Sequence, residues 1–294
     1  MKSFGILLAL VSAAIVLAAP TPTDTNILQF ALSLELLENN FYSTGLGQFD
    51  DQAFAEAGFP AWVRGRFEQI GEHEAEHVSF LQAALGSAAP QPCTYNFPYT
   101  DPKSFAALAM ALEGVGASAY LGAAQYISDK NTLTAAGSIL AVESRHAGWI
   151  SSAVLKLQPW DGSFETPLGL SGAFSLASEF IVSCPSTNPP LPISTFPALT
   201  VSTMTPSAGY IIGLTFSNPT GASPTYLAWM TGLDVVFTNI DGSGVTTVPS
   251  GLFGTVYVGV VSSNQLPLSD ASMVTGLAIV EFPFNSTMGR ITAP

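Results

Sequence analysis

The chain has 294 residues, enough for a leader and two modest domains. Only 8 Lys and Arg stand against 21 Asp and Glu, so the formal net charge is −13 at pH 7. This acidic balance argues against nucleic acid or an anionic membrane as a partner. The chain holds two cysteines, a count that excludes a four-cysteine zinc site.

The first 19 residues have the pattern of a secretory signal peptide. Lys2 supplies the positive start, residues 4–17 are apolar, and Ala18 and Ala19 offer a cleavage site. The apolar run is short for a membrane span, and no later segment has about 18 uninterrupted apolar residues. We therefore expect a secreted protein, extracellular or in the cell wall, with no membrane span.

Residues 20–184 are predicted to form a bundle of four helices. Helical spacing of apolar residues covers about 24–43, 60–86, 102–128 and 131–157. Asp101 and Asp129 are suited to cap helix starts, and Gly45 and Gly86 to end helices. The connection between the second and third helices is longer and rich in proline, which predicts a crossover along the bundle.

Residues 185–294 are predicted to form a small antiparallel β-sandwich, which makes the chain an α+β multidomain protein. This half is rich in Thr, Ser, Pro, Gly and Val, and Asp241-Gly242 is a turn signal. The β-favouring runs are residues 210–216, 234–238, 255–261 and 277–282. Residues 185–192 have the composition of a linker.

Three further features of the sequence concern its surroundings. Cys93 and Cys184 are expected to pair in an oxidising compartment. Asn285, followed by Ser286 and Thr287, is one acceptor motif for N-glycosylation. The apolar and nearly uncharged β-half would suit self-association into a homo-oligomer, or attachment to a surface.

A weak internal repeat carries the chemistry. Glu35 is followed seven residues later by Tyr42, and Glu113 is followed by Tyr120 at the same distance. A Glu-x-x-His motif lies downstream of each pair. The order is therefore Glu, ExxH, Glu, ExxH, with one element on each helix. The predicted metal ligands are Glu35, Glu74, His77, Glu113, Glu143 and His146.

The spacing of these residues has a physical reason. Residues three apart lie on one face of a helix, so a Glu and a His in ExxH can bind the same metal or adjacent metals. The apolar residues on the same faces indicate that the glutamates point into the interior. Four buried carboxylates repel one another, and two divalent ions would balance their charge. Carboxylate and imidazole ligands suit iron or manganese, with zinc as an alternative.

Other residues near these motifs have two interpretations. Glu38 competes with Glu35, but the repeat aligns Glu38 with Gly116 and so favours Glu35. Glu38 is left as an extra ligand or as a residue that supports one. Tyr42 and Tyr120 are either core aromatics or donors of hydrogen bonds to ligand carboxylates.

Two motifs are set aside. Residues 73–77 match the HExxH motif of zinc proteases, in which His73 and His77 would bind zinc. That interpretation lacks a third ligand and leaves Glu35, Glu113 and the second ExxH unexplained. Residues 114–119 resemble a dinucleotide-binding loop, but they lie in the middle of a helix, where small residues more readily serve helix packing.

These motifs resemble the ferritin-like di-metal carboxylate superfamily, in which two helices each give one Glu and the other two each give an ExxH. The chain is similar to secreted fungal ferritin-like proteins of the stress-response, desiccation-related and late-sexual-development type. The likeness covers residues 24–157 by motif and extends to Cys184-Pro185 and residues 196–200. It implies a di-iron or di-manganese site, with Glu74 and Glu113 as bridging ligands.

The resemblance leaves the function open, because superfamily members carry out iron oxidation, peroxide breakdown and O2 chemistry. The first hypothesis is a secreted oxidase or catalase-like enzyme acting on O2 or peroxide. The second is a non-catalytic stress or cell-surface protein with a structural metal site. Iron storage ranks below both, because an appended sandwich hinders assembly of a closed shell.

Overall fold

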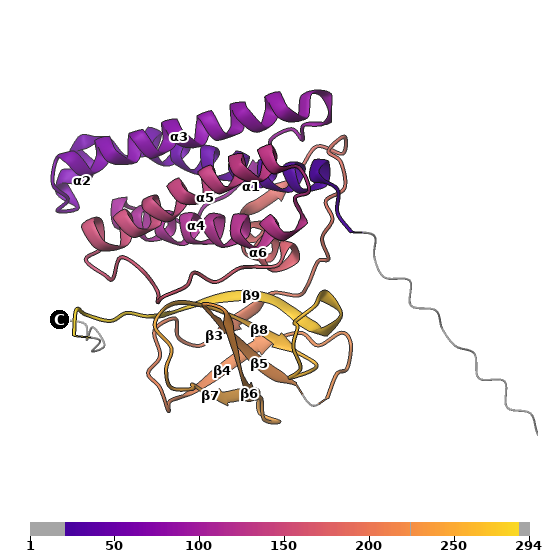
Figure 1. Cartoon of the computed structure of the whole chain (residues 1–294). Helices are drawn as coiled ribbons and strands as arrows, with labels where there is room; N and C mark the ends of the chain where they lie inside the picture. Colours follow the sequence, from indigo (N-terminus) through magenta and orange to yellow (C-terminus); the bar gives the residue numbers. More distant parts are fainter. Residues whose placement is uncertain (1–20, 224, 288–294) are drawn as a thin grey trace, which may run out of the picture.

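The computed structural model describes residues 21–223 and 225–287, so the predicted signal peptide lies outside the described residues. Helices form one layer of the molecule and antiparallel sheets form the other (Figure 1). This arrangement confirms the predicted α+β fold class.

Four long helices build the bundle, and α1 packs along α3 while α4 packs along α5 (Figure 1). Their bounds are α1 Asp24–Gln48, α3 Trp62–Leu85, α4 Pro102–Ala123 and α5 Lys130–Trp149. Aromatic rings fill the end of the core, where Phe41 stacks on Phe105 with ring centroids 4.7 Å apart. Within the described chain, the helical stretch at residues 102–126 is long and apolar enough to span a membrane by length and composition. Of its apolar 18-residue window, 67% is buried inside the protein.

The helix ends follow the predicted caps with one exception. Asp101 accepts hydrogen bonds from the backbone N–H groups of Lys103 and Ser104, and Asp129 accepts one from Thr132. The predicted end at Gly45 is wrong, because α1 continues to Gln48. A Cβ atom on Gly45 would lie 2.3 Å from the Phe105 ring, so this glycine permits close helix packing and does not end the helix.

The remaining helices are short. They are α2 (Asp51–Glu56), the π-helical turn η3 (Ile150–Val154) that continues α5, α6 (Leu170–Ala177), and the 3-10 turns η1 (Gly86–Ala88), η2 (Ala124–Tyr126), η4 (Ser178–Phe180) and η5 (Asp270–Ser272). Two of them fall inside the predicted helical ranges 102–128 and 131–157, and periodicity did not indicate those at residues 51–56, 170–177, 178–180 and 270–272. Helix α6 lies between α4 and the β-half and contacts both.

The crossover after α3 packs on the bundle and is held by a disulfide. Phe97 contacts Phe41 with ring centroids 5.2 Å apart. Strand β1 (Thr94–Tyr95) pairs with β2 (Ile181–Ser183), which follows α6. The disulfide between Cys93 and Cys184 lies beside this ladder, so the predicted pairing is confirmed.

The β-half consists of two antiparallel sheets, with strand orders β3-β4-β7 and β6-β5-β8-β9, that enclose one apolar core. The bounds are β3 Leu199–Val201, β4 Ile211–Phe216, β5 Tyr226–Thr231, β6 Asp234–Asn239, β7 Val245–Thr247, β8 Gly254–Val261 and β9 Met273–Phe282. The turn predicted at Asp241 is present, and its side chain accepts hydrogen bonds from the N–H groups of Ser243 and Val245. The predicted linker at residues 185–192 follows β2, and the domain boundary there stays a prediction.

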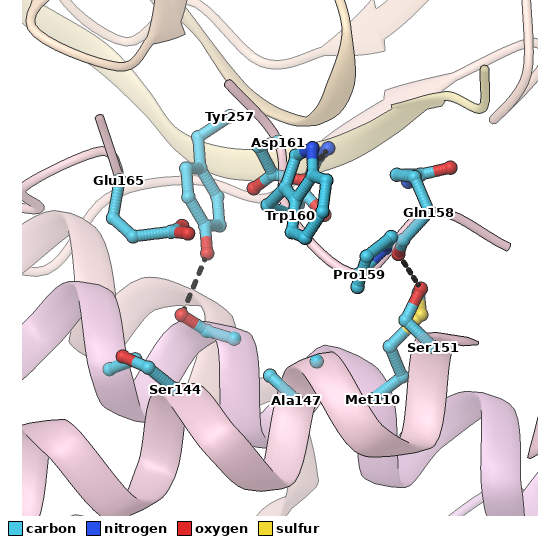
Figure 2. Close-up of a pocket in the computed structure, with 14 residues that line it drawn as sticks. Met110, Ser144, Ala147, Ser151, Gln158, Pro159, Trp160, Asp161, Glu165 and Tyr257 are labelled. Atoms are coloured by element: carbon cyan, nitrogen blue, oxygen red, sulfur yellow. Dashed lines mark hydrogen bonds between the residues drawn. The ribbon is translucent and has the colours of Figure 1, made fainter. Parts of the chain in front are cut away.

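The two halves share a core and a polar seam. Tyr257 of β8 is buried among residues of the helical half, and its hydroxyl donates to the Gly114 carbonyl of α4 at 3.0 Å. Asp161 and Glu165, on the segment after η3, lie around the same cavity as Tyr257 (Figure 2). The Thr255 N–H donates to Asp161 Oδ1 at 2.7 Å. The segment at residues 158–168 therefore links the bundle to β8.

This seam predicts greater stability in acid. Burial, with the charges of Glu165 and Glu281, raises the pKa of Asp161 to about 7. Because the folded state holds this proton more tightly than the unfolded state, its contribution to stability is present in acid and lost as pH rises through 7. Asp161→Asn keeps the acceptor oxygen but cannot titrate. Urea unfolding at pH 5 and pH 8 should show wild type losing about 2–3 kcal/mol more than the variant over this interval.

Asp234→Asn, at an exposed position at the start of β6, is the control, and it should follow wild type at both pH values. Equal pH dependence of wild type and Asp161→Asn would contradict the assignment.

Candidate metal centre

All six predicted ligands converge inside the bundle. Helix α1 supplies Glu35, α4 supplies Glu113, and α3 and α5 each supply one ExxH pair. Their ligand atoms fall into two groups, and within each group all atoms lie within 4.8 Å of one another. The groups are Glu35, Glu74, His77 and Glu143, and Glu74, Glu113, Glu143 and His146.

The glutamates point inward because their helix faces are apolar. Ile70 and Leu81, which flank the first ExxH on the same face of α3, are 4% and 2% exposed. Glu74 between them is 0% exposed, as are the other three glutamates of the two groups. The sequence pattern therefore forces charged groups into the core.

Each histidine turns Nδ1 toward the carboxylates. His77 Nδ1 lies 3.0 Å from Glu74 Oε2, 3.2 Å from Glu35 Oε2 and 3.3 Å from Glu143 Oε1. His146 Nδ1 lies 2.9 Å from Glu113 Oε2 and 3.4 Å from Glu74 Oε1. The two imidazoles thus occupy opposite ends of one carboxylate cluster.

The electrostatics of this cluster hold protons inside the bundle. Burial raises the pKa of Glu35 to about 7 and that of Glu143 well above its ordinary value. Burial alone lowers the pKa of His77, but its close contacts with the carboxylates of Glu143, Glu35 and Glu74 outweigh burial and raise this pKa to about 12. The same opposition raises the pKa of His146 to about 9 through Glu113 and Glu74. When no metal is bound, the protonated imidazoles of His77 and His146 are therefore the cations of this cluster.

The cluster leaves buried carboxylate oxygens without a hydrogen bond. Across the described ranges, Glu74 Oε1 and both carboxylate oxygens of Glu143 are buried and have no hydrogen-bond partner. Such groups cost free energy unless something binds them. Both glutamates belong to both ligand groups. Two divalent ions, one in each group, would therefore give these oxygens a binding partner. The buried Glu and His side chains suit a di-metal site.

The geometry also ranks the bridging ligands. Glu74 and Glu143 are shared by the two groups, whereas Glu113 belongs to one. The two ExxH glutamates are thus the bridging candidates. The resemblance implied Glu74 and Glu113. The grouping favours Glu143 over Glu113 as the second bridge, and the identity of the bridging pair stays a prediction.

The two tyrosines of the repeat cross between its halves. The Tyr42 hydroxyl of α1 donates to Glu113 Oε1 of α4, and the Tyr120 hydroxyl of α4 donates to Glu35 Oε1 of α1 at 2.5 Å. Both rings are buried, so each tyrosine is a core aromatic and also a donor to a candidate ligand. Sequence spacing showed the pairs but not this exchange, because the exchange depends on how α1 packs against α4.

Glu38 is a fifth buried carboxylate, 4% exposed, and it belongs to neither ligand group. Its pKa is raised by burial and by the charges of nearby glutamates, of which Glu143 contributes most. A Cβ atom on Gly116 would lie 2.9 Å from Glu38 Oε1 and 2.8 Å from Glu143 Oε2. The glycine that aligns with Glu38 in the repeat therefore leaves the space that these carboxylates occupy.

His73 contacts the centre from outside. It is exposed and belongs to neither ligand group, so the geometry does not favour the zinc-protease interpretation. Its Nδ1 lies 3.0 Å from His146 Nε2, and the two rings stack with centroids 5.2 Å apart. When His146 binds metal through Nδ1, its Nε2–H donates to His73 and fixes the ring orientation. Sequence reasoning treated His73 only as part of a misleading motif and missed this contact.

Comparison with known proteins agrees with this geometry. The family model of the ferritin-like domain matches residues 23–156, a range that includes all four long helices. The chain is also 30% identical over 179 residues to Protein rds1 of Schizosaccharomyces pombe. That match covers 60% of this chain and 44% of the relative, so it spans less than half of the relative's length. Both matches agree with the resemblance that the motifs indicate, namely to ferritin-like proteins of fungi.

The site predicts a sharp contrast between two Glu→Gln substitutions. Glu143→Gln barely changes volume but removes a charged ligand from both groups. We expect it to weaken binding of divalent metal by more than the roughly 10- to 100-fold lost with a supporting partner. Glu72→Gln, on the exposed face of α3, should bind like wild type. Titration with Mn²⁺ or Fe²⁺ measures both, and equal affinities would contradict the site.

Metal binding should also release protons. His77 and His146 have pKa values raised to about 12 and about 9, so both are protonated at neutral pH without metal. Each must lose a proton to bind metal through Nδ1, so affinity should rise between about pH 6 and pH 9. Calorimetry in buffers of different ionisation enthalpy measures the protons released. Binding without proton release would show that the imidazoles are not ligands.

Proposed function

We propose that this protein is a secreted di-metal carboxylate protein that binds two iron or manganese ions and carries out redox chemistry on O2 or peroxide. The observation that supports it is the set of orphaned oxygens on Glu74 and Glu143 between two groups of carboxylate and imidazole ligands. Oxygen and nitrogen donors of this kind suit iron and manganese, whereas zinc would fill the same ligands without redox chemistry.

Bound iron or manganese would supply the electrons and a Lewis acid for O2 or peroxide. The chain supplies a site that is buried from solvent and hydrogen-bond donors that hold the candidate ligands. Tyr120 orients Glu35 and Tyr42 orients Glu113, so neither carboxylate is free to rotate. His73 does the same for His146 and connects that ring to solvent. These contacts would hold the ligands in place around bound metal.

Secretion and a role in stress or development belong to the same proposal. The proposed signal peptide and the Cys93–Cys184 disulfide support an oxidising compartment. The glycosylation motif lies at the surface, because Asn285 and Thr287 are exposed. The Asn285 side-chain oxygen accepts hydrogen bonds from the backbone N–H and the hydroxyl of Thr287. Large apolar side chains such as Tyr210, Ile211 and Leu233 are more than 60% exposed on the β-half and support self-association or surface attachment.

One observation favours a second candidate, a structural metal site in a non-catalytic stress or cell-surface protein. The ligands come from all four long helices, and the four glutamates are 0% exposed. Ions at this position would tie the bundle together, and binding to the folded state would stabilise it.

Metal analysis and activity assays separate the two candidates. Elemental analysis of protein from its native secreting host should find two iron or manganese ions per chain. Loaded protein should then consume O2 with a reductant or break down peroxide, and Glu143→Gln should lose this activity while Glu72→Gln keeps it. Loaded protein that melts higher than chelated protein but has neither activity would support the structural role instead. Protein without metal under every loading condition would exclude both.

A further inference from the structure

The two ends of the α3–α5 pair differ: aromatic and imidazole rings pack between the helices at the closed end, and a cavity lies between them at the open end. These helices run antiparallel on either side of the metal centre. At the closed end, Trp149 of α5 packs against Trp62 and Phe67 of α3, with ring centroids 6.0 and 5.4 Å apart. The stacked pair of His73 and His146 closes the next turn. Approach to the centre from this side is therefore blocked by rings.

At the open end lies a cavity of about 200 Å³. It is placed beyond His77, where α3 ends and α5 begins. All four long helices contribute to its wall, and the residues used below are Leu28, Phe80, Ala84, Tyr120, Ala135 and Ile139. Phe80, one of the lining residues, is 51% exposed, which is unusual for a phenylalanine.

Tyr120 connects this cavity to the metal centre. Tyr120 lines the cavity, and its hydroxyl donates to Glu35 Oε1 at 2.5 Å. Ile139, also in the wall, precedes the ligand Glu143 by one helical turn. A molecule in the cavity would therefore lie one side chain away from the candidate ligands.

The chemistry of the wall selects the occupant. The lining residues include no charged side chain, and the Tyr120 hydroxyl is already bonded to Glu35. The polar lining residues other than Tyr120 are Asn131 and Thr132, at the start of α5. An apolar cavity of about 150 Å³ in another protein stays dry and binds benzene. The volume here thus suits a molecule of the size of a substituted benzene or a short alkyl chain.

We propose that this cavity binds a small, uncharged, apolar molecule against Tyr120, and that this is the class of organic substrate presented to the di-metal centre. Binding itself stands on the cavity alone, whereas the assignment as substrate rests on the proposed redox function. The apolar wall disfavours organic acids and other charged molecules, which would lose their hydration without a partner.

Toluene is a suitable probe, and its binding is measured by calorimetry on metal-free protein. Ala135→Phe places a ring in the cavity from α5 and should weaken toluene binding at least about 10-fold. Ala141→Phe makes the same change at an exposed position of the same helix and should bind like wild type. Ala84→Phe fills the cavity from α3 and gives a second test if Ala135→Phe does not fold; its control is Ala83→Phe, exposed and outside the cavity wall.

Equal toluene affinities for the filling and control variants, or no toluene binding by wild type, would overturn the proposal. The link to the centre has its own readout. In protein loaded with Co²⁺, toluene should shift the visible absorption of the metal in wild type and not in Ala135→Phe. Toluene binding with no such shift would overturn the assignment as substrate. If the protein bound no metal but still bound toluene in the cavity, the proposed redox function would fail and the binding site would stand.

Discussion

The burial of like charges is the constraint on which the rest of the structure depends. Four glutamates with no exposed surface lie within reach of one another at the centre of the bundle. In water these carboxylates would be hydrated and apart, so the fold must supply counter-charge and donors. Two imidazoles and two tyrosine hydroxyls supply part of this, but three oxygens of Glu74 and Glu143 have no hydrogen bond in the described structure. A pair of divalent ions would complete the balance, and the buried Glu and His side chains suit such a pair.

The surrounding fold stabilises the elements that carry these charges. The aromatic cluster around Phe41 and Phe105 joins α1 to α4, the two helices that each carry one glutamate of the repeat. On the other side of α4, Tyr257 of the sandwich donates to the Gly114 carbonyl, one residue after the ligand Glu113. The β-half is thus in contact with the helix that supplies part of the site, and changes at the seam are expected to reach the centre through α4.

Much of the site could be predicted from the sequence because its signal is local. The two ExxH motifs and their upstream glutamates indicate which side chains are candidate ligands and which helix face points inward. The caps at Asp101 and Asp129 fix where two of the helices begin. What could not be predicted depends on packing between elements. Gly45 has the sequence signal of a helix end, and only its packing against Phe105 shows its actual role. The hydrogen bonds of Tyr42 to Glu113 and of Tyr120 to Glu35 depend on how α1 packs against α4. The sharing of Glu143 by both ligand groups likewise depends on the position of α5.

The most direct test of the central claim is an anomalous-scattering map of crystals loaded with manganese. The account predicts two peaks roughly 3.5–4 Å apart, as in other two-metal sites. One peak should contact Glu35 and His77, the other should contact Glu113 and His146, and Glu74 and Glu143 should lie between them. A single peak, a peak bound by His73 and His77, or no peak inside the bundle would contradict the account.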